Sequence, residues 1–223
     1  MTRTELHIAF KTAIDKNAPS VAFGGSPAFL PEEIDYWLNQ GLYQEINTKF
    51  TGNNANKVAF EGNTKRIHDL ERLVRTDSKV GLITESNINR CYVLNLHNDE
   101  RLFFIDAVLN IGPNKANVVL VDHTTAQRFR KTHNNNPWIE NPVGVIENNR
   151  LYIYYDPLTE IPDTVDITYL KTPTKIEDLP PAGMDEIPEY MQYEVVNRAV
   201  ELALEDIESR RVQTKTQLNQ LDE

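Results

Sequence analysis

The feature that most constrains the fold of this chain is the order of its periodic segments. Helical hydrophobic spacing opens the 223-residue chain, two-residue alternation fills the middle, and helical spacing returns near the end. Separate runs of helices and strands are typical of α+β proteins, whereas parallel α/β folds alternate the two. We therefore predict an α+β fold: a helical bundle from the N- and C-terminal helices, with a β-rich middle module.

The first part of the chain predicts three helices, at residues 2–16, 31–50 and 62–75. Thr4 has the side chain of an N-cap for the first helix, and Pro31 suits the first position of the second. Gly41 lies in the apolar stripe of the second helix and indicates a close approach by another backbone.

The third predicted helix has a mixed surface. Its spacing turns Ile67, Leu70, Leu73 and Val74 inward. Asp69 lies on its polar face, together with Lys65, Arg66, Glu71, Arg72 and Arg75. A mixed charge run of this kind is usually solvated, and the alternative is a contact between subunits.

The middle of the chain reads as a series of strands. The predicted strands are Val80–Thr84, Arg90–Leu96, Leu102–Leu109, Asn117–Asp122, Gly144–Ile146, Arg150–Tyr155 and Thr164–Leu170. Asn148 and Asn149 predict a hairpin turn, and residues 123–132 predict a short helix. The Asn-rich stretch before Trp138 predicts a loop.

A proline-bearing connector at residues 171–188 leads to a last helix, predicted from Glu189 to Glu208. Its predicted buried face contains Tyr193, Val196, Ala199, Val200, Ala203, Leu204 and Ile207. Residues 209–223 form a polar tail with little to bury, which predicts fraying unless a partner orders it. We divide the chain into 1–77, 78–172 and 173–223.

Composition narrows the classes of function. The net charge of −10 argues against direct duplex recognition, which needs clustered Lys and Arg, but suits a surface that DNA passes without sticking. The start of the chain lacks a signal-peptide profile, and no apolar run is long enough for a membrane span. The single cysteine, Cys91, is expected to be a buried apolar residue in a protein made in a reducing cytoplasm.

No motif predicts catalysis, a cofactor or a metal site. The five histidines are scattered, without a short-range partner for metal binding. Asp122 and His123 are neighbours, but adjacent side chains at a strand end point to opposite faces. A cap on the short helix, by Asp122 or Thr124, is the expected role.

Tyrosines are frequent in the later strands: Tyr152, Tyr154, Tyr155 and Tyr169. Such a sheet can stack bases, as in single-strand nucleic-acid binders. Because we see no interleaved Lys or Arg, we expect packing on a sheet face instead.

Five segments, taken in order, resemble virion structural proteins of tailed bacteriophages. They are Pro31-Glu-Glu-Ile-Asp-Tyr-Trp-Leu-Asn39, Phe60-Glu-Gly-Asn-Thr-Lys-Arg66, Leu151-Tyr-Ile-Tyr-Tyr-Asp156, Thr168-Tyr-Leu-Lys-Thr-Pro173 and Ala199-Val-Glu-Leu-Ala-Leu-Glu-Asp-Ile-Glu208. The chain looks most like the ring or adaptor proteins of crAss-like phages, related to the head–tail adaptor of short-tailed phages, the tail tubular protein A type. The resemblance covers roughly residues 30–208 and rests on combination and order.

The resemblance implies a non-enzymatic subunit of the head–tail connector in the virion neck. It implies a homo-oligomeric ring of about a dozen copies, in which unlike surfaces meet. Its partners would be the portal protein above, the next tail or ring protein below, and genomic DNA passing through the ejection channel without sequence-specific binding. We place the chain in the first ring, under the portal.

Residues are assigned to these contacts as expectations. Candidates for the interface between subunits are Trp37, Tyr43, Arg66, Arg72, Glu201 and Glu205. Candidates for docking of the chain's own C-terminal tail, residues 209–223, on the portal protein are Arg210, Arg211, Gln213, Lys215 and Leu218.

Three alternatives stay open. The first is another virion role, as a capsid auxiliary or tail-hub protein. The second is a small hydrolase that uses Asp122 and His123. The third is a single-strand nucleic-acid binder that uses the tyrosine sheet, which the net charge disfavours.

Overall fold

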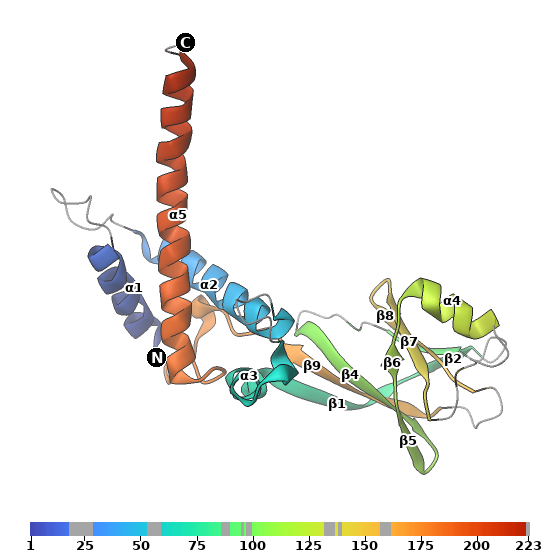
Figure 1. The fold of residues 1–223 in the computed structure, drawn as a ribbon. Helices are drawn as coiled ribbons and strands as arrows, with labels where there is room; N and C mark the ends of the chain where they lie inside the picture. The colour runs from blue at the N-terminus through green and yellow to red at the C-terminus, as the bar shows by residue number, and fades with distance from the viewer. Residues whose placement is uncertain are drawn as a thin grey trace. The chain divides into compact units, whose positions relative to one another are not determined.

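The chain divides into two compact units (Figure 1). The computed structural model describes residues 1–17, 29–52, 59–85, 90–94, 96, 100–131, 137, 140–156 and 162–221. The helical unit consists of Met1–Arg72 and Pro173–Glu223, and the β unit consists of Leu73–Thr172. Among the described residues there are five α-helices and two sheets, which confirms the predicted α+β class.

The three longest helices of the helical unit pack together. They are α1 (Arg3–Asn17), α2 (Pro31–Thr51) and α5 (Glu189–Leu221), and each of the first two packs against α5 (Figure 1). Their buried side chains recur at helical spacing: Leu6, Phe10 and Ile14; Ile34, Leu38, Leu42 and Ile46; Met191, Val195, Val196, Ala199, Val200 and Ala203. No helix in the described part of the chain has the length and apolar character needed to cross a bilayer.

The backbones of α2 and α5 meet at Gly41, as predicted. A Cβ added to Gly41 would lie 2.9 Å from the backbone nitrogen of Ala199 and 2.9 Å from the carbonyl oxygen of Val195. The absence of a side chain at this position therefore sets the distance between the two helices.

The start of α1 differs from the prediction. The hydroxyl of Thr2 accepts the backbone N–H of Glu5 at 3.3 Å, and the Glu5 carboxylate accepts the N–H of Thr2 at 2.8 Å. This reciprocal pair is a capping box, so Thr2, and not Thr4, caps the helix. The start of α2 at Pro31 is confirmed, and Gly52 ends that helix with φ at 74°.

The third predicted helix is too long at both ends. A 3₁₀ turn at Phe60–Gly62 precedes α3 (Thr64–Leu70), and a second 3₁₀ turn at Glu71–Leu73 leads into β1 (Val74–Gly81). The predicted module boundary at residue 78 therefore falls inside β1. Val74 and Arg75 leave the helix because they pair with Leu170 and Tyr169 of β9 (Thr164–Lys171).

The last helix begins at Glu189, as predicted, but it continues to Leu221 instead of ending at Glu208. In Figure 1 its C-terminal part extends past α1 and α2. The connector before it contains a 3₁₀ turn at Ile176–Asp178. The N–H of Met184, also in the connector, donates to the carbonyl of Met1 at 2.8 Å, which joins the connector to the start of the chain.

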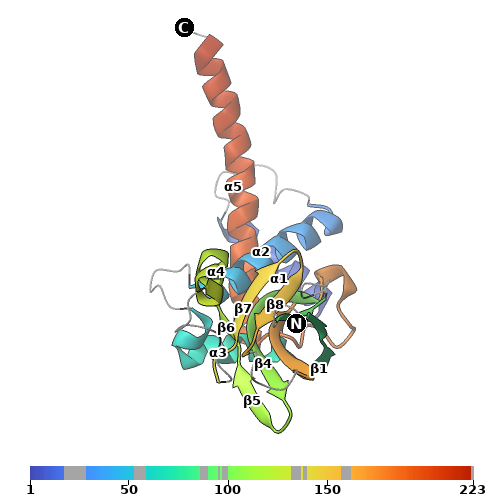
Figure 2. The ribbon, with the colours of Figure 1, turned by 90° about the vertical axis from the view of Figure 1, so that its right-hand side faces the viewer.

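The β unit contains a four-stranded and a five-stranded sheet. The first has the order β1-β9-β4-β5, with β4 at Arg101–Ile111 and β5 at Asn114–Asn117. The second has the order β2-β3-β8-β7-β6, with β2 at Ile83–Glu85, β3 at Arg90–Val93, β8 at Arg150–Tyr154, β7 at Val143–Glu147 and β6 at Val119–Leu120. Figure 2 labels β8, β7 and β6 of this sheet. All neighbouring strands are antiparallel except β6 and β7.

The two sheets enclose one apolar core. Cys91, Val93, Leu151 and Ile153 from the five-stranded sheet pack with Leu109, Val165 and Ile167 from the four-stranded sheet. Cys91 is fully buried, as predicted, and burial raises the pKa of its thiol to about 12. A thiol in that state is a packing group and not a nucleophile.

Two predicted strands are each divided between the sheets. The predicted strand at 80–84 spans the end of β1 and the start of β2, and the one at 117–122 spans the end of β5 and all of β6. At Val118, which is buried, the chain crosses from one sheet to the other. Asn148 and Asn149 form the predicted hairpin turn with φ of 48° and 59°, and the predicted short helix is α4 (His123–Lys131).

Candidate functional site

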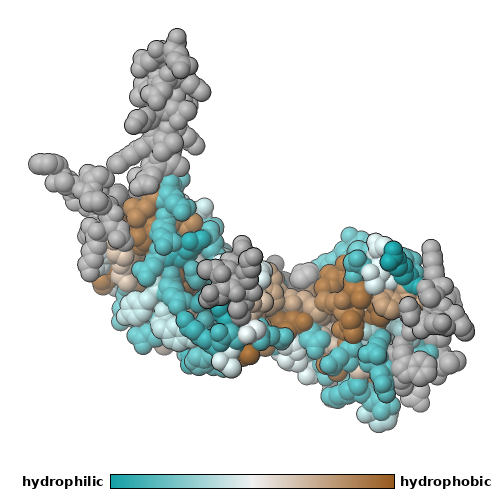
Figure 3. All heavy atoms as spheres, in the orientation of Figure 1, coloured by the Kyte–Doolittle hydropathy of each residue, from teal (hydrophilic) through white to brown (hydrophobic). Residues whose placement is uncertain are grey.

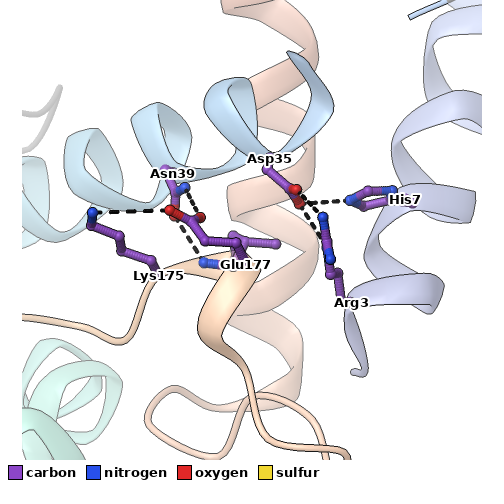
Figure 4. A network of polar contacts seen from close by, with 7 residues as sticks. Arg3, His7, Asp35, Asn39, Lys175 and Glu177 are labelled. Carbon is purple, nitrogen blue, oxygen red and sulfur yellow. Dashed lines mark hydrogen bonds and ion pairs between the residues drawn. The ribbon is translucent and has the colours of Figure 1, made fainter. Parts of the chain in front are cut away.

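A cleft of about 420 Å³ lies in the helical unit, between α1, α2 and the 3₁₀ turn at Ile176–Asp178. It is lined by Arg3, Glu32, Asp35, Tyr36, Asn39, Tyr43, Lys175 and Glu177. Figure 4 shows Asp35 and Asn39 side by side on α2, each pointing to a different neighbouring segment. The cleft therefore joins the start of the chain, its second helix and its connector.

Asp35 is the buried anchor of this cleft. Its carboxylate accepts hydrogen bonds from the guanidinium of Arg3 and contacts Nε2 of His7 at 2.7 Å. Burial acts to raise the pKa of Asp35, but the hydrogen bonds from Arg3 and His7 outweigh it and the pKa is lowered. The carboxylate is thus held ionised between two partners from α1.

Asn39 connects α2 to the connector. Its amide donates to the Glu177 carboxylate at 2.8 Å, and its carbonyl oxygen accepts the backbone N–H of Ile176 at 3.0 Å. The hydrogen bond from Asn39 is the main cause of a lowered pKa of Glu177. The ammonium of Lys175 lies 3.9 Å from the Glu177 carboxylate, so the connector brings both members of an ion pair to the cleft.

A second polar network lies deeper in the helical unit. The ammonium of Lys49 on α2 donates to Asp69 on α3 at 3.1 Å and to Glu194 on α5 at 2.5 Å. The Tyr190 hydroxyl also donates to Asp69, and burial together with this bond raises the pKa of Tyr190 to about 12. Lys49 and Asp69 have side-chain exposures of 5% and 0%, and together with Glu194 and Tyr190 they connect α2, α3 and α5.

Asp69 was predicted on the solvated face of its helix and Ile67 on the inner face, and both predictions are wrong. Ile67 is 40% exposed, whereas Asp69 is fully buried. Lys49 and Tyr190 supply the hydrogen bonds that make burial of the carboxylate possible.

A cluster of arginine and tyrosine lies on the β unit, on the face of the five-stranded sheet turned away from the core. We call Arg90, Tyr92, Arg150 and Tyr152 the Arg–Tyr cluster. The guanidinium carbon of Arg90 lies 4.6 Å from the ring centroid of Tyr152, and that of Arg150 lies 5.3 Å from the ring centroid of Tyr92. The two rings are 5.4 Å apart, and all four residues are half-buried.

The expectation that no basic residue interleaves with the tyrosines is therefore wrong. Tyr92 and Tyr152 are cross-strand partners in β3 and β8, and each has an arginine two residues earlier. Arg-x-Tyr occurs twice, as Arg90-Cys91-Tyr92 and Arg150-Leu151-Tyr152, which is the sequence signal for the cluster. Of the other tyrosines, Tyr154 is covered by Ala126 of α4, and Tyr155 and Tyr169 belong to the core between the sheets.

The residues predicted for subunit contacts lie on α2, α3, α5 and the 3₁₀ turn at Glu71–Leu73 of the helical unit. Trp37 packs edge-on against Tyr36, with ring centroids 5.0 Å apart, and Tyr43 lines the cleft. Arg66 is half-buried on α3, and Arg72 donates to the Asp185 carboxylate at 2.9 Å.

Glu201 accepts a hydrogen bond from Arg198 at 2.9 Å, and Glu205 is exposed one turn later on α5. The predicted portal-docking residues Arg210, Arg211, Gln213, Lys215 and Leu218 lie on the helical backbone of α5, and their side chains are outside the described residues.

Asp122 caps α4, which was its expected role. Its carboxylate accepts the backbone N–H of Thr125 at 2.6 Å, and hydrogen bonding to Thr125 is the main cause of its lowered pKa. Within the described part of the chain, no three His, Cys, Asp or Glu residues gather as a metal site. His97, His133 and Trp138 lie outside the described residues.

Comparison of the sequence with models of known protein families and with curated proteins gave no match.

Proposed function

We propose that this chain is a structural subunit of the head–tail connector of a tailed phage, located in the virion neck beneath the portal. Copies would assemble side by side into a ring of about a dozen subunits. The ring would extend the DNA channel and dock the tail or the next ring. In this proposal the chain acts by assembly and not by catalysis.

The observation that carries the proposal is the division of the chain. Helices from its two ends form one compact unit, and the whole middle of the sequence forms a second unit. The sequence resemblance to ring and adaptor proteins implies this arrangement of a helical bundle with a β-rich insertion. Two units of different shape give one subunit separate surfaces for a neighbouring copy and for the next component.

Two further features support a role in assembly. The last helix, α5, continues from Glu189 to Leu221, and a helix of 33 residues is long enough to take part in an assembly. The acidic balance of the chain suits a channel wall, because like charge keeps DNA from adhering.

Quantitative mass spectrometry of purified particles of the phage that encodes the chain would test the proposal. Copy number would be scaled to that of the major capsid protein. We expect about a dozen copies per particle, as one closed ring requires. Hundreds of copies would favour a capsid auxiliary protein, and absence from particles would contradict every virion role.

A further inference from the structure

The Arg–Tyr cluster contains one charge that is positioned but little used. Arg90 is satisfied, because its Nε and Nη2 both donate to the carboxylate of Glu85. Arg150 donates only a long hydrogen bond, at 3.3 Å, to the hydroxyl of Tyr152, and no carboxylate among the described residues pairs with it. A guanidinium has five N–H donors, so most of the binding capacity of Arg150 is available.

The cluster is also held in place before any partner arrives. The Arg150 guanidinium packs on the Tyr92 ring, and the Tyr152 ring contacts both Tyr92 and the Arg90 guanidinium. A fixed side chain loses little conformational entropy on binding. Tyrosine and arginine are the residues most enriched, with tryptophan, among those that dominate binding energy at protein interfaces.

The charges around Arg150 favour a single carboxylate over a phosphate chain. Glu147 is the cross-strand partner of Arg150, and Glu85 lies at the opposite end of the cluster. Residues 73–172 contain 10 Lys and Arg but 12 Asp and Glu. A nucleic-acid strand would meet these carboxylates at successive phosphates, whereas a carboxylate side chain needs only the guanidinium.

The helical unit presents such a carboxylate. Its residues contain 21 Asp and Glu against 13 Lys and Arg. Glu201 and Glu205 are one turn apart on α5, where like charges repel and destabilise the helix. Arg198 neutralises Glu201, but no ion pair involving Glu205 occurs among the described residues, and Glu205 is exposed.

We propose that the Arg–Tyr cluster of one copy binds α5 of a second copy, with Arg150 pairing with Glu205. The two surfaces are unlike, and repetition of such a contact closes into a ring or extends into a filament. The inference deepens the proposed function, on which it rests, by naming one joint between subunits.

Charge exchange between the two positions tests the contact in the full-length chain. The readout is self-association by sedimentation velocity at low salt. We expect Arg150→Glu and Glu205→Arg each to weaken association about tenfold or more, and the double variant to restore it. Arg75→Glu is the control, because Arg75 is an exposed arginine on β1 of the same unit.

A second variant at position 150 distinguishes loss of the contact from loss of folding. Arg150→Glu places two carboxylates on opposite strands, because Glu147 is its partner, and this could unfold the hairpin. Arg150→Gln removes the charge without that repulsion and should weaken association as well. Circular dichroism verifies that each variant keeps its fold.

Several results would overturn the contact: a monomeric wild type, full association of folded Arg150→Gln, or failure of the double variant to restore association. Binding of a labelled dT oligonucleotide that depends on Arg150, by a chain that does not self-associate, would assign the cluster to nucleic acid instead. If particles contain about a dozen copies but charge exchange fails, the connector proposal stands and this joint does not. If the double variant restores association but the chain is absent from particles, this joint stands and the connector proposal does not.

Discussion

The helical unit and the β unit of this chain fix the register of their elements in different ways. The backbone hydrogen bonds of an α-helix lie within that helix, so in the helical unit they do not prevent helices from sliding past one another. In the β unit they lie between strands and set the register directly. Of the five buried polar or charged residues among the described ones, four are in the helical unit: Asp35, Lys49, Asp69 and Gln192.

This difference shows what buried polar groups contribute here. Lys49 joins α2 to α3 and α5, and Asp35 joins α2 to α1. Each of these hydrogen bonds forms only when the two helices that it joins are in one relative position. The β unit relies instead on its apolar core, and its Arg–Tyr cluster stacks charged groups on tyrosines. On the visible face of the β unit in Figure 3, hydrophobic (brown) and hydrophilic (teal) residues lie next to one another. The predictions below test this contrast, from the largest expected effect to the smallest.

Loss of the Lys49 ammonium should have the largest effect. Lys49→Met leaves the buried Asp69 carboxylate with only the Tyr190 hydroxyl of the two partners described here, and breaking such a pair costs about 3–5 kcal/mol. Urea unfolding, with hydrogen exchange in α2 and α3, measures the loss. Lys65→Met is the matched control, because Lys65 is 63% exposed, and should cost about 0.5 kcal/mol or less. Equal effects of the two variants would remove the contrast between the units.

In the β unit, a cavity in the apolar core should cause a loss of stability comparable to that of Lys49→Met in the helical unit. Ile153 is fully buried between the sheets, and Ile153→Ala should cost about 2–5 kcal/mol. Val119→Ala, at a side chain 48% exposed on β6, should cost much less. Thermal unfolding of both variants measures the difference, and a mild effect at Ile153 would mean that the apolar core does not hold the sheets together.

The close approach of α2 and α5 predicts a smaller effect at a glycine. Gly41→Ala forces backbone atoms apart, at a cost of about 1–3 kcal/mol that exceeds the helix propensity gained. Gly81→Ala is the control, because nothing lies within 4 Å of a Cβ at Gly81 in β1. A stabilising Gly41→Ala in a denaturant titration would contradict the tight packing of these helices.

Acid should reveal the smallest effect, through Asp35. Its pKa lies below 3.8 in the folded chain, so the ionised carboxylate stabilises the fold. This contribution is fully present well above pH 3.8, where the unfolded carboxyl is also ionised, and is lost as the pH falls through the lowered folded-state pKa. Wild type should therefore lose stability more steeply than Asp35→Asn below pH 3.8, as followed by circular dichroism. Parallel curves for the two proteins would show that Asp35 contributes nothing through its charge.

The sequence predicted features that depend on local pattern. The starts of α2 and α5, the turn at Asn148 and Asn149, and the burial of Cys91 follow from capping residues, turn residues and alternation. Gly41 marked the contact of two helices because a glycine in an apolar stripe leaves room for the backbone of a neighbouring helix.

Features that depend on a distant partner were missed. The third helix ends earlier than predicted because Val74 pairs with Leu170 in the sheet. Asp69 is buried because Lys49 and Tyr190 bind it from other helices. Tyr193 was predicted on the buried face of α5 and is 53% exposed. The Arg–Tyr cluster needs the register of β3 and β8, which the sequence of neither strand reveals alone.

Cryo-electron microscopy of the neck of intact particles tests the connector proposal most directly. We predict repeated density around the axis beneath the portal, into which the helical unit and the β unit each fit as a compact body. A neck whose density accommodates neither unit, in particles that contain the chain elsewhere, would contradict it.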